Sequence, residues 1–169
     1  MKNNSIKFDI RLATQKDIPG LLRLLQYILS LHSNGRPDIF NNAGSKYGQS
    51  ELETIVKDKY TPIFVAVDCD AESGAPDSIL GYAFCIEKEI KNNRVLKERK
   101  ILYLDDLCVD ESCRGLGLGS KLMEAVSDYA KSISADSIEL NVWGFNESAI
   151  SFYEHMGYKV QKSTMEYKL

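Results

Sequence analysis

Two adjacent carboxylates and a glycine-spaced turn are the residues of this chain best placed to do chemistry. Asp105 and Asp106 lie in the apolar, β-prone run Ile101–Val109, and the turn Arg114–Gly119 follows shortly after it. A helical pattern begins at Ser120. Strand, glycine-rich turn and helix N-terminus together form a site for phosphate groups, because backbone N–H groups point at the anion and glycines let the backbone approach closely. The sequence therefore predicts an anion-binding turn beside two candidate proton acceptors.

The order of residues distinguishes this turn from two other phosphate-binding loops. A P-loop needs lysine followed by serine or threonine after its last glycine, whereas Ser120 and Lys121 stand in the reverse order. A dinucleotide-binding turn needs the spacing G-x-G-x-x-G, and the spacing from Gly115 to Gly119 is G-x-G-x-G. A tight strand-to-helix turn without a ligand is the alternative interpretation.

A second informative segment covers residues 137–158. The run Ile138–Trp143 alternates between apolar and polar residues, as expected of a strand. Asn146 is suited to cap a short helix that continues through Glu154, and Gly157 is suited to end it.

Both segments resemble the GNAT superfamily of N-acetyltransferases. The pattern Arg-x-x-Gly-x-Gly, from Arg114 to Gly119, resembles the family's pyrophosphate-binding motif. The pattern Asn-x-x-Ala-x-x-Phe-Tyr-x-x-x-Gly-Tyr, from Asn146 to Tyr158, resembles its second signature. Residues 10–19 are similar to its first strand and the start of its first helix. Residues 102–109 most resemble the diamine and polyamine N-acetyltransferase branch, which has an acidic pair at this position.

The resemblance implies that acetyl-CoA is the co-substrate and that its acetyl group passes directly, in a ternary complex, to a primary amine of a small molecule. It also implies a homodimer. An exposed strand backbone would pair with the pantetheine arm, and Arg114 would add charge at the diphosphate. The cofactor-binding residues that it indicates are Leu107, Cys108, Val109, Arg114, Gly115, Leu116, Gly117, Leu118, Gly119, Ser120 and Asn146.

A thioester is already activated, so proton transfer is the main chemistry left to the protein. Transfer from an alkylammonium (pKa about 10.4) to an aspartate (about 3.9) is uphill by roughly 9 kcal/mol. The base must therefore act through water, or the site must shift both pKa values. The resemblance favours Asp105 as the base and Asp106 as a charge that binds the acceptor. Strand alternation sends them to opposite faces, so both reach one site only if a β-bulge lies there. An exposed acidic pair is the alternative.

Tyr153 is the candidate acid for the departing thiolate. A coenzyme thiol resembles cysteine, with a pKa of about 8.5 against about 10 for tyrosine, so donation is uphill by only about 2 kcal/mol. That step is feasible when the phenol is already hydrogen-bonded to sulfur. The alternative is an aromatic core residue beside Phe152. Asn146 either binds the cofactor arm or only caps its helix.

The acceptor pocket of this family is usually lined by loops near the first helices. That placement indicates Tyr27, His32, Arg36, Asp38 and Phe40 as candidate acceptor-binding residues. The alternatives are a packed or surface histidine at position 32 and a simple turn over residues 36–38.

Composition excludes several classes. The net charge of −3 argues against general nucleic-acid binding, and no apolar run is long enough for a membrane span. The segment Met1–Ser5 lacks the apolar region of a secretion signal. The cysteines form no CxxC pair and have no histidine nearby, which indicates a reduced, metal-free protein of the cytoplasm. They are Cys69, Cys85, Cys108 and Cys113.

The length of 169 residues predicts one domain spanning residues 1–169. Strands are expected over residues 6–12, 62–68, 79–86, 101–109, 138–143 and 158–168, and helices over 17–33, 50–59, 117–133 and 146–154. The charged run Glu87–Lys100 indicates a solvated hairpin connection. This order predicts an α/β fold with a mixed, mostly antiparallel twisted sheet flanked by helices and one parallel crossover.

Two other functions are compatible with the same residues. A non-catalytic sensor would use the glycine turn to capture acyl-CoA without turnover. A protein N-terminal or lysine acetyltransferase would need an open groove for a peptide.

Overall fold

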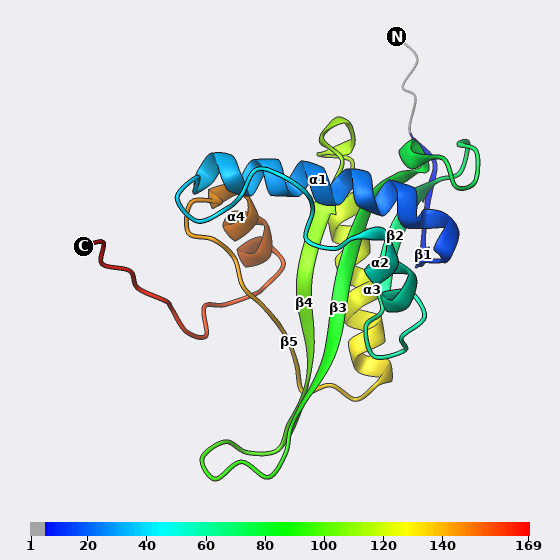
Figure 1. Cartoon of the computed structure of the whole chain (residues 1–169). Coiled ribbons are helices and arrows are strands. Elements are labelled where there is room, and N and C mark those ends of the chain that lie inside the picture. Colours follow the sequence, from blue (N-terminus) through cyan, green and yellow to red (C-terminus); the bar gives the residue numbers. More distant parts are fainter. Residues whose placement is uncertain (1–5) are drawn as a thin grey trace.

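Five strands form a single mixed sheet in the computed structural model, which describes residues 6–169 (Figure 1). The strands are β1 (Phe8–Leu12), β2 (Ile63–Asp68), β3 (Ile79–Ile90), β4 (Arg99–Val109) and β5 (Ser137–Leu140). They lie side by side in chain order and are antiparallel, except for the parallel pair β4–β5. The predicted fold class is therefore confirmed. The prediction about a secretion signal at Met1–Ser5 lies outside the described residues.

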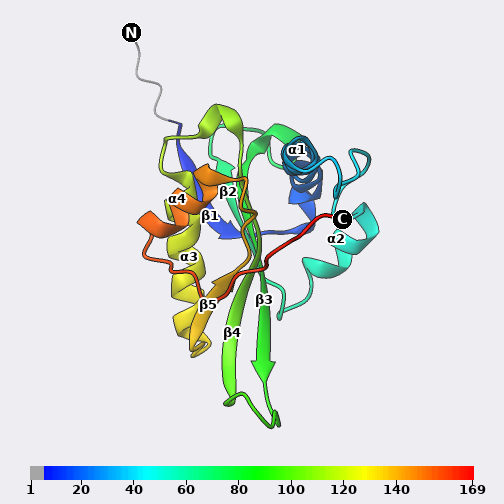
Figure 2. The same ribbon diagram turned by 90° about the vertical axis from the view of Figure 1, so that its left-hand side faces the viewer.

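Helices cover both faces of this sheet (Figure 2). The helices α1 (Ile18–Gly35) and α2 (Gln49–Ile55) lie on one face, and α3 (Leu118–Ser132) and α4 (Glu147–His155) lie on the other. Short 3-10 turns span Gln15–Asp17, Pro76–Ser78 and Glu111–Cys113. The connection from β4 through α3 to β5 is the predicted parallel crossover.

The spacing of apolar residues decides which side of each helix is buried. Leu21, Leu24 and Leu25 recur at the helical period on α1 and are fully buried against the sheet. Leu122 and Val126 do the same on α3, against the opposite face. Strand β3 lies between the two helical layers, so seven of its residues in succession are buried. These two layers hold β3 and β4 in a fixed position between them.

Two arginine–aspartate pairs fasten α1 to its surroundings. Both Nη atoms of Arg11 donate to the carboxylate of Asp17, at 2.7 and 2.9 Å, and Asp17 is only 2% exposed. Arg23 donates to Asp110 at 2.5 Å and to the carbonyl oxygen of Ile79 at 2.8 Å. Asp110 directly follows β4, so Arg23 holds α1 against the end of the strand that carries the acidic pair.

The β3–β4 hairpin is longer than the sequence indicates. Pairing continues from Glu87↔Leu102 to Ile90↔Arg99, so both strands enter the charged run that was expected to be a connection. Backbone pairing in an antiparallel hairpin does not need a buried face, which explains why charged residues continue the ladder. The hairpin projects beyond the helical layers (Figure 1).

The prediction of a last strand over residues 158–168 is wrong. These residues form no strand, because no neighbouring strand of the chain lies along them to complete a ladder. One backbone hydrogen bond, from the N–H of Tyr158 to the oxygen of Tyr153 at 2.9 Å, and several side-chain contacts connect the segment to the rest of the chain. Gln161 donates to Glu139 at 3.2 Å, Glu166 accepts from Arg36 at 2.9 Å, and Lys168 donates to Asp38 at 2.7 Å. The segment therefore crosses from the α4 side of the sheet to the end of α1 (Figure 2).

None of the helices formed by residues 6–169 has the length and apolar character needed to cross a membrane.

Candidate functional site

Strand β4 carries one extra residue where the acidic pair lies. Opposite β3, Phe84 pairs with Asp106 and Cys85 pairs with Leu104, so the register passes over Asp105. Such a bulge turns both carboxylates to the same face, because it cancels one step of strand alternation. The bulge on which the sequence-based interpretation depended is therefore present. Both side chains lie on the face covered by α1 and α2.

A tyrosine hydroxyl donates to each carboxylate on that face. The Tyr47 hydroxyl lies 2.7 Å from Oδ2 of Asp105, and the Tyr82 hydroxyl lies 3.0 Å from Oδ2 of Asp106. The ring of Phe84 connects the two tyrosines. It stacks on Tyr47 at 5.5 Å and meets Tyr82 edge-on at 5.0 Å between ring centroids. The two tyrosine hydroxyls thus hold the carboxylates in place, and the Phe84 ring packs against both tyrosines.

The two carboxylates have different electrostatic surroundings. Asp105 forms an ion pair with Lys46, whose Nζ lies 2.7 Å from Oδ2. Asp106 has Tyr82 as its side-chain donor, and burial raises the pKa of Asp106 to about 6. The positive charge of Lys46 and the Tyr82 hydrogen bond oppose that rise. Asp106 thus titrates closer to neutrality than an ordinary carboxyl group.

Beside the bulge, β5 diverges from β4 (Figure 1). Their pairing runs from Ile101↔Ser137 to Leu104↔Leu140 and goes no further. Beyond Leu104, β4 remains hydrogen-bonded to β3 on one side only, up to Val109. The backbone of residues 107–109, which the resemblance assigns to the cofactor, therefore has a second edge that pairs with no strand of the described chain.

The glycine turn leads directly into the N-terminus of α3. Gly115 and Gly117 have φ values of +76° and +82°, which favour glycine, and a Cβ at either position would meet no atom within 4 Å. Gly117 is the N-cap residue, no side chain caps the helix, and the N–H of Lys121 is bonded to the Gly117 oxygen at 3.0 Å. The N–H groups of residues 118–120 therefore face the open side of the turn, where an anion can accept from them.

Arg114 and Tyr27 lie together at this turn. Nη2 of Arg114 donates to the Tyr27 hydroxyl at 2.7 Å. Sequence reasoning placed Tyr27 among the acceptor-binding residues, whereas its contact is with a residue of the anion-binding turn. Tyr27 projects from α1, so the first helix also contributes to this end of the site.

Tyr153 packs on the other side of the sheet, in α4. Its ring meets Phe152 at 5.3 Å and Tyr158 at 5.7 Å between centroids. Burial raises the pKa of Tyr153 well above its usual value, and the negative charge of Asp106 raises it further. Tyr153 and Asp106 are therefore electrostatically coupled although their elements lie on different layers. Asn146 caps α4, accepting from the N–H of Ala149 at 3.1 Å, which is one of its two expected roles.

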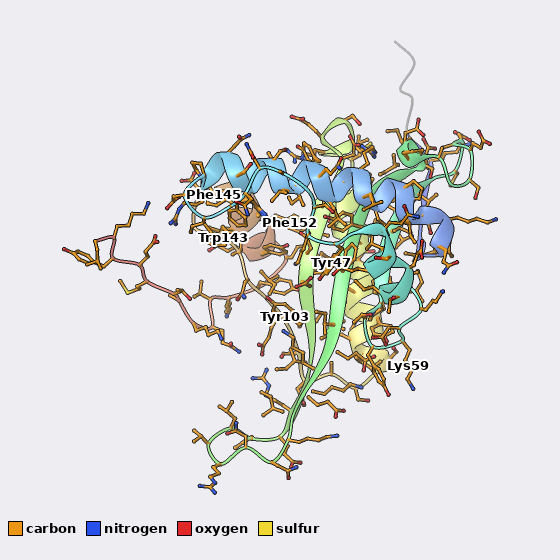
Figure 3. All side chains as sticks on the ribbon, viewed as in Figure 1. Tyr47, Lys59, Tyr103, Trp143, Phe145 and Phe152 are labelled. Atoms are coloured by element: carbon orange, nitrogen blue, oxygen red, sulfur yellow. The ribbon has the colours of Figure 1, made fainter. Side chains whose placement is uncertain are left out.

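Four aromatic side chains, His32, Phe40, Trp143 and Phe145, form a cluster, here called the aromatic cluster. Trp143 and Phe145 lie near the end of α1 (Figure 3). His32 stacks on Phe40 at 5.1 Å, and Trp143 meets Phe40 at 5.0 Å and Phe145 at 6.2 Å. Burial lowers the pKa of His32, and the charge of Lys46 lowers it further, so the imidazole is neutral at pH 7. His32 and Phe40, two of the candidate acceptor-binding residues, thus pack with Trp143 and Phe145 in one cluster.

Arg36 and Asp38 bind each other rather than facing the acidic pair. Nε of Arg36 donates to Asp38 at 2.8 Å. Glu166 and Lys168 of the C-terminal segment pair with these two residues. Their charges are therefore matched within the chain, and they lie apart from the contacts around Asp105.

Sequence reasoning missed Lys46, Tyr47 and Tyr82, which contact the carboxylates. Lys46 and Tyr47 belong to the glycine-containing loop 36–48, where no periodic pattern marks a functional residue. They reach Asp105 across 58 or more residues of chain. Tyr82 lies in the expected apolar strand over residues 79–86. Only the register between β3 and β4 shows that this residue lies beside Asp106.

Cysteine thiols and metal-ligating side chains are the remaining reactive groups among residues 6–169. All four cysteines are free, and burial raises the pKa of Cys108 to about 12, so its thiol stays protonated. The described part of the chain holds no cluster of three or more metal-ligating side chains.

The raised pKa of Asp106 predicts a stability cost at neutral pH. The unfolded chain loses this proton near pH 4 and the folded chain near pH 6, so the penalty is absent below pH 4 and complete above pH 6. We expect Asp106→Asn to stabilise the fold at pH 7.5 by about 2–3 kcal/mol, since each pKa unit corresponds to about 1.4 kcal/mol, and to have little effect at pH 3.5. Urea unfolding across this pH range measures the difference.

Asp105→Asn is the matched control. It removes the partner of Lys46 and should bring no gain at pH 7.5. A loss of stability in Asp106→Asn that is as large at pH 7.5 as at pH 3.5 would contradict the prediction.

Comparison with known proteins places this geometry in one family. Residues 28–158 match the Acetyltransferase (GNAT) family. Among solved structures, a tetramutant of the BH1408 protein from Bacillus halodurans is 34% identical, with a TM-score of 0.88 over 95% of this chain and 99% of that chain.

Two curated relatives show the range of the matches. N-alpha-acetyltransferase 30 of Saccharomyces cerevisiae is 30% identical over 108 residues, which are 64% of this chain and 58% of the relative. Tyramine N-feruloyltransferase 4/11 of Nicotiana tabacum is 30% identical over 110 residues, 65% of this chain and 46% of the relative. The matches span less than two thirds of the length of these relatives. The family match covers most of the chain, and the chain belongs to the GNAT family of acetyltransferases.

Proposed function

We propose that this chain transfers the acetyl group of acetyl-CoA to a primary amine of a small molecule, by direct attack in a ternary complex. The observation that carries the proposal is the β4 bulge. It brings Asp105 and Asp106 to one face of the sheet, at the point where β5 leaves β4. An acceptor amine can therefore reach carboxylates on one side of a strand whose free backbone edge is suited to hold the thioester.

The coenzyme fits the groups along this edge. The backbone of residues 107–109 would pair with the pantetheine arm as a further strand does, and the N–H groups at the start of α3 would bind the diphosphate. Arg114 would add a positive charge at the same end, with Tyr27 holding its guanidinium.

Asp106 is the base that the electrostatics favour, although the sequence resemblance points to Asp105. With a pKa of about 6, Asp106 makes proton transfer from an ordinary ammonium uphill by about 6 kcal/mol instead of roughly 9. Desolvation of the amine in the site would reduce the remainder. Asp105, which already accepts from Lys46 and Tyr47, would bind the acceptor's ammonium group.

Tyr153 would protonate the leaving thiolate, and because burial raises its pKa above that of an ordinary tyrosine, this donation is more uphill than for a free phenol. The charge of Asp106 helps to hold the Tyr153 pKa high, so the phenol stays protonated while Asp106 is ionised. When Asp106 takes the proton of the ammonium, that charge disappears and the phenol becomes a stronger acid. The nitrogen attacks the carbonyl carbon, the C–S bond breaks, and sulfur takes the phenol proton. The second proton lost by nitrogen restores the phenol.

A protein N-terminus is the second candidate acceptor, because N-alpha-acetyltransferase 30 of budding yeast is among the relatives. The loop 36–48 argues for the smaller acceptor. It places Lys46 and Tyr47 directly on Asp105, so two side chains of this loop occupy space beside the carboxylate that a peptide acceptor would need. The aromatic cluster nearby is suited to contact the apolar part of a compact amine.

The proposal is tested by a panel of diamines, arylalkylamines, amino acids and short peptides, with release of free coenzyme thiol as the readout. Turnover on small amines with little on peptides supports it. A preference for peptides by about 100-fold or more in kcat/KM would favour the second candidate. Tight binding of acetyl-CoA without turnover on any amine would favour a sensor.

We also propose that residues 1–169 act as one domain and that the chain forms a homodimer. Support for the dimer comes from apolar side chains in the segment after α4 that are exposed to solvent. Met165 is 93% exposed and Tyr167 is 89% exposed. A second copy would cover them. Light scattering at tens of micromolar should show a dimer, and a monomer would contradict this assignment.

Gly117→Ala should weaken the binding of coenzyme A at least about 10-fold, or 1.4 kcal/mol. A side chain at this left-handed position strains the backbone by about 1 kcal/mol and enters the open space before α3. Gly74→Ala is the control, because Gly74 has a similar φ of +88° in a turn far from the site. Calorimetry should find normal affinity in that variant. Equal affinities in the two variants would remove the anion-binding role of the turn.

Tyr153→Phe should retain the fold and acetyl-CoA affinity and lose about 10- to 1000-fold in turnover, because a positioned proton donor is typically worth about 10²–10⁴-fold. Tyr158→Phe is the matched control, since Tyr158 packs on the same ring and burial also raises its pKa, to about 12. Wild-type turnover in Tyr153→Phe would show that this ring only packs. Steady-state kinetics on the best amine of the panel makes the comparison.

A further inference from the structure

A lysine of the chain itself occupies the position expected for the acceptor's ammonium group. Nζ of Lys46 lies 2.7 Å from Oδ2 of Asp105 and 3.3 Å from the backbone oxygen of the same residue. It also lies 5.6 Å from the centre of the Tyr47 ring. The primary amine of Lys46 is therefore held at the bulge by a carboxylate, a carbonyl oxygen and an aromatic face.

The surroundings of this amine match those proposed for the acceptor. Asp105 is the first residue of β4 beyond its pairing with β5, which ends at Leu104↔Leu140. The charge of Lys46 reaches Asp106, whose pKa it lowers. Both carboxylates thus act on Lys46, and the free edge of β4 begins beside it. Lys46 stands in the loop between α1 and α2, and its Nζ reaches the bulge from there.

Other lysines of the described residues have different partners. Lys121 and Lys131 form exposed pairs with Glu124 and Asp128 one helical turn away on α3. Lys100 pairs with Glu87 on the hairpin. Among residues 6–169, Lys46 is the lysine whose Nζ contacts the acidic pair.

We propose that Lys46 is an acceptor in its own right, and that the protein acetylates Nζ of Lys46 from acetyl-CoA when no external amine is present. This inference rests on the proposed function, because it uses the same thioester, base and acid. The two reactions differ only in the amine that accepts the acetyl group.

The atoms and protons of this reaction balance in the same way as those of the proposed transfer to an external amine. The ammonium of Lys46 gives a proton to Asp106, and the neutral nitrogen attacks the carbonyl carbon of the thioester. An N–C bond forms, the C–S bond breaks, and the coenzyme leaves as a thiol with the proton of Tyr153. The second proton of the nitrogen returns to the phenol. The products are acetylated Lys46, free coenzyme A and one proton on Asp106.

The modification would change the site that produced it. An acetylated lysine is neutral and has no ammonium to pair with Asp105, so the ion pair at the bulge is lost. Lys46 and an external amine also compete for one position. A good external acceptor should therefore suppress the modification of Lys46 in proportion to its saturation of the site.

The test incubates the purified protein with acetyl-CoA alone and follows intact mass and the modified peptides over time. We expect one acetyl group at Lys46, added at least about 100-fold faster than at Lys131, because held reactants gain a large effective concentration. The rate should be first-order and independent of protein concentration. Lys46→Arg keeps the positive charge and should remain unmodified, while Lys131→Arg should still be acetylated at Lys46.

Tyr153→Phe separates enzymatic transfer from simple chemical acetylation. It should slow the modification of Lys46 about as much as it slows external turnover, whereas uncatalysed acetylation of a surface lysine would not change. Calorimetry confirms that the variant still binds acetyl-CoA.

Two results overturn the inference. One is modification of Lys46 no faster than that of Lys131 in protein that binds acetyl-CoA. The other is a rate that rises with protein concentration, which would indicate transfer between copies. The amine panel is measured in parallel. Turnover on external amines without selective modification of Lys46 refutes this inference and leaves the proposed function standing, and inactivity in both assays refutes both.

Discussion

The extra residue at Asp105 is the constraint on which the rest of the site depends. A regular β4 would point one carboxylate toward the α1 face and the other toward the α3 face, because side chains alternate along a strand. The bulge cancels one alternation and bends the strand. The same irregularity lies where β5 leaves β4, so a single local feature collects the acids and borders the free strand edge.

The charged groups around the bulge suit proton transfer better than they suit the stability of the fold. Two neighbouring carboxylates repel each other, and burial penalises Asp106 further. Lys46, Tyr47 and Tyr82 offset part of this cost with one positive charge and two hydroxyl donors. A carboxyl group that retains its proton up to about pH 6 is the result. A fold selected for stability alone would place an amide or an apolar side chain there.

The sheet also connects groups on its two faces. Asp106 accepts from Tyr82 on the α1 face, yet its charge acts on Tyr153 of α4, which packs with the opposite layer. Protonation of one group therefore changes the acidity of the other without any movement of the backbone. Asp106 lies beyond the end of the β4–β5 pairing, so no β5 backbone is hydrogen-bonded to it there.

Local pattern was enough to predict most of the fold and half of the candidate site. Periodicity identified α1, α3 and the inner strands, because each element buries one regular face, and glycine spacing identified the turn before α3. The prediction of a strand over residues 158–168 was wrong because a strand needs a neighbouring strand to pair with. The presence of such a neighbour depends on the tertiary structure and not on the local sequence. The positions of Asp105, Asp106 and Tyr153 could be proposed from motifs, but their pKa values depend on burial that a sequence does not display.

The sequence by itself determined the order of the strands up to β5 and of the four helices, the glycine turn before α3 and the acidic pair on β4. Only the tertiary structure decided that both carboxylates share a face, and that Lys46 and Tyr47 from a distant loop cover Asp105. The physical reason is the separation along the chain over which each interaction acts. Helix period, strand alternation and turn conformation act over a few residues, whereas strand register and side-chain contacts join residues 58 or more positions apart, with no trace in the local pattern.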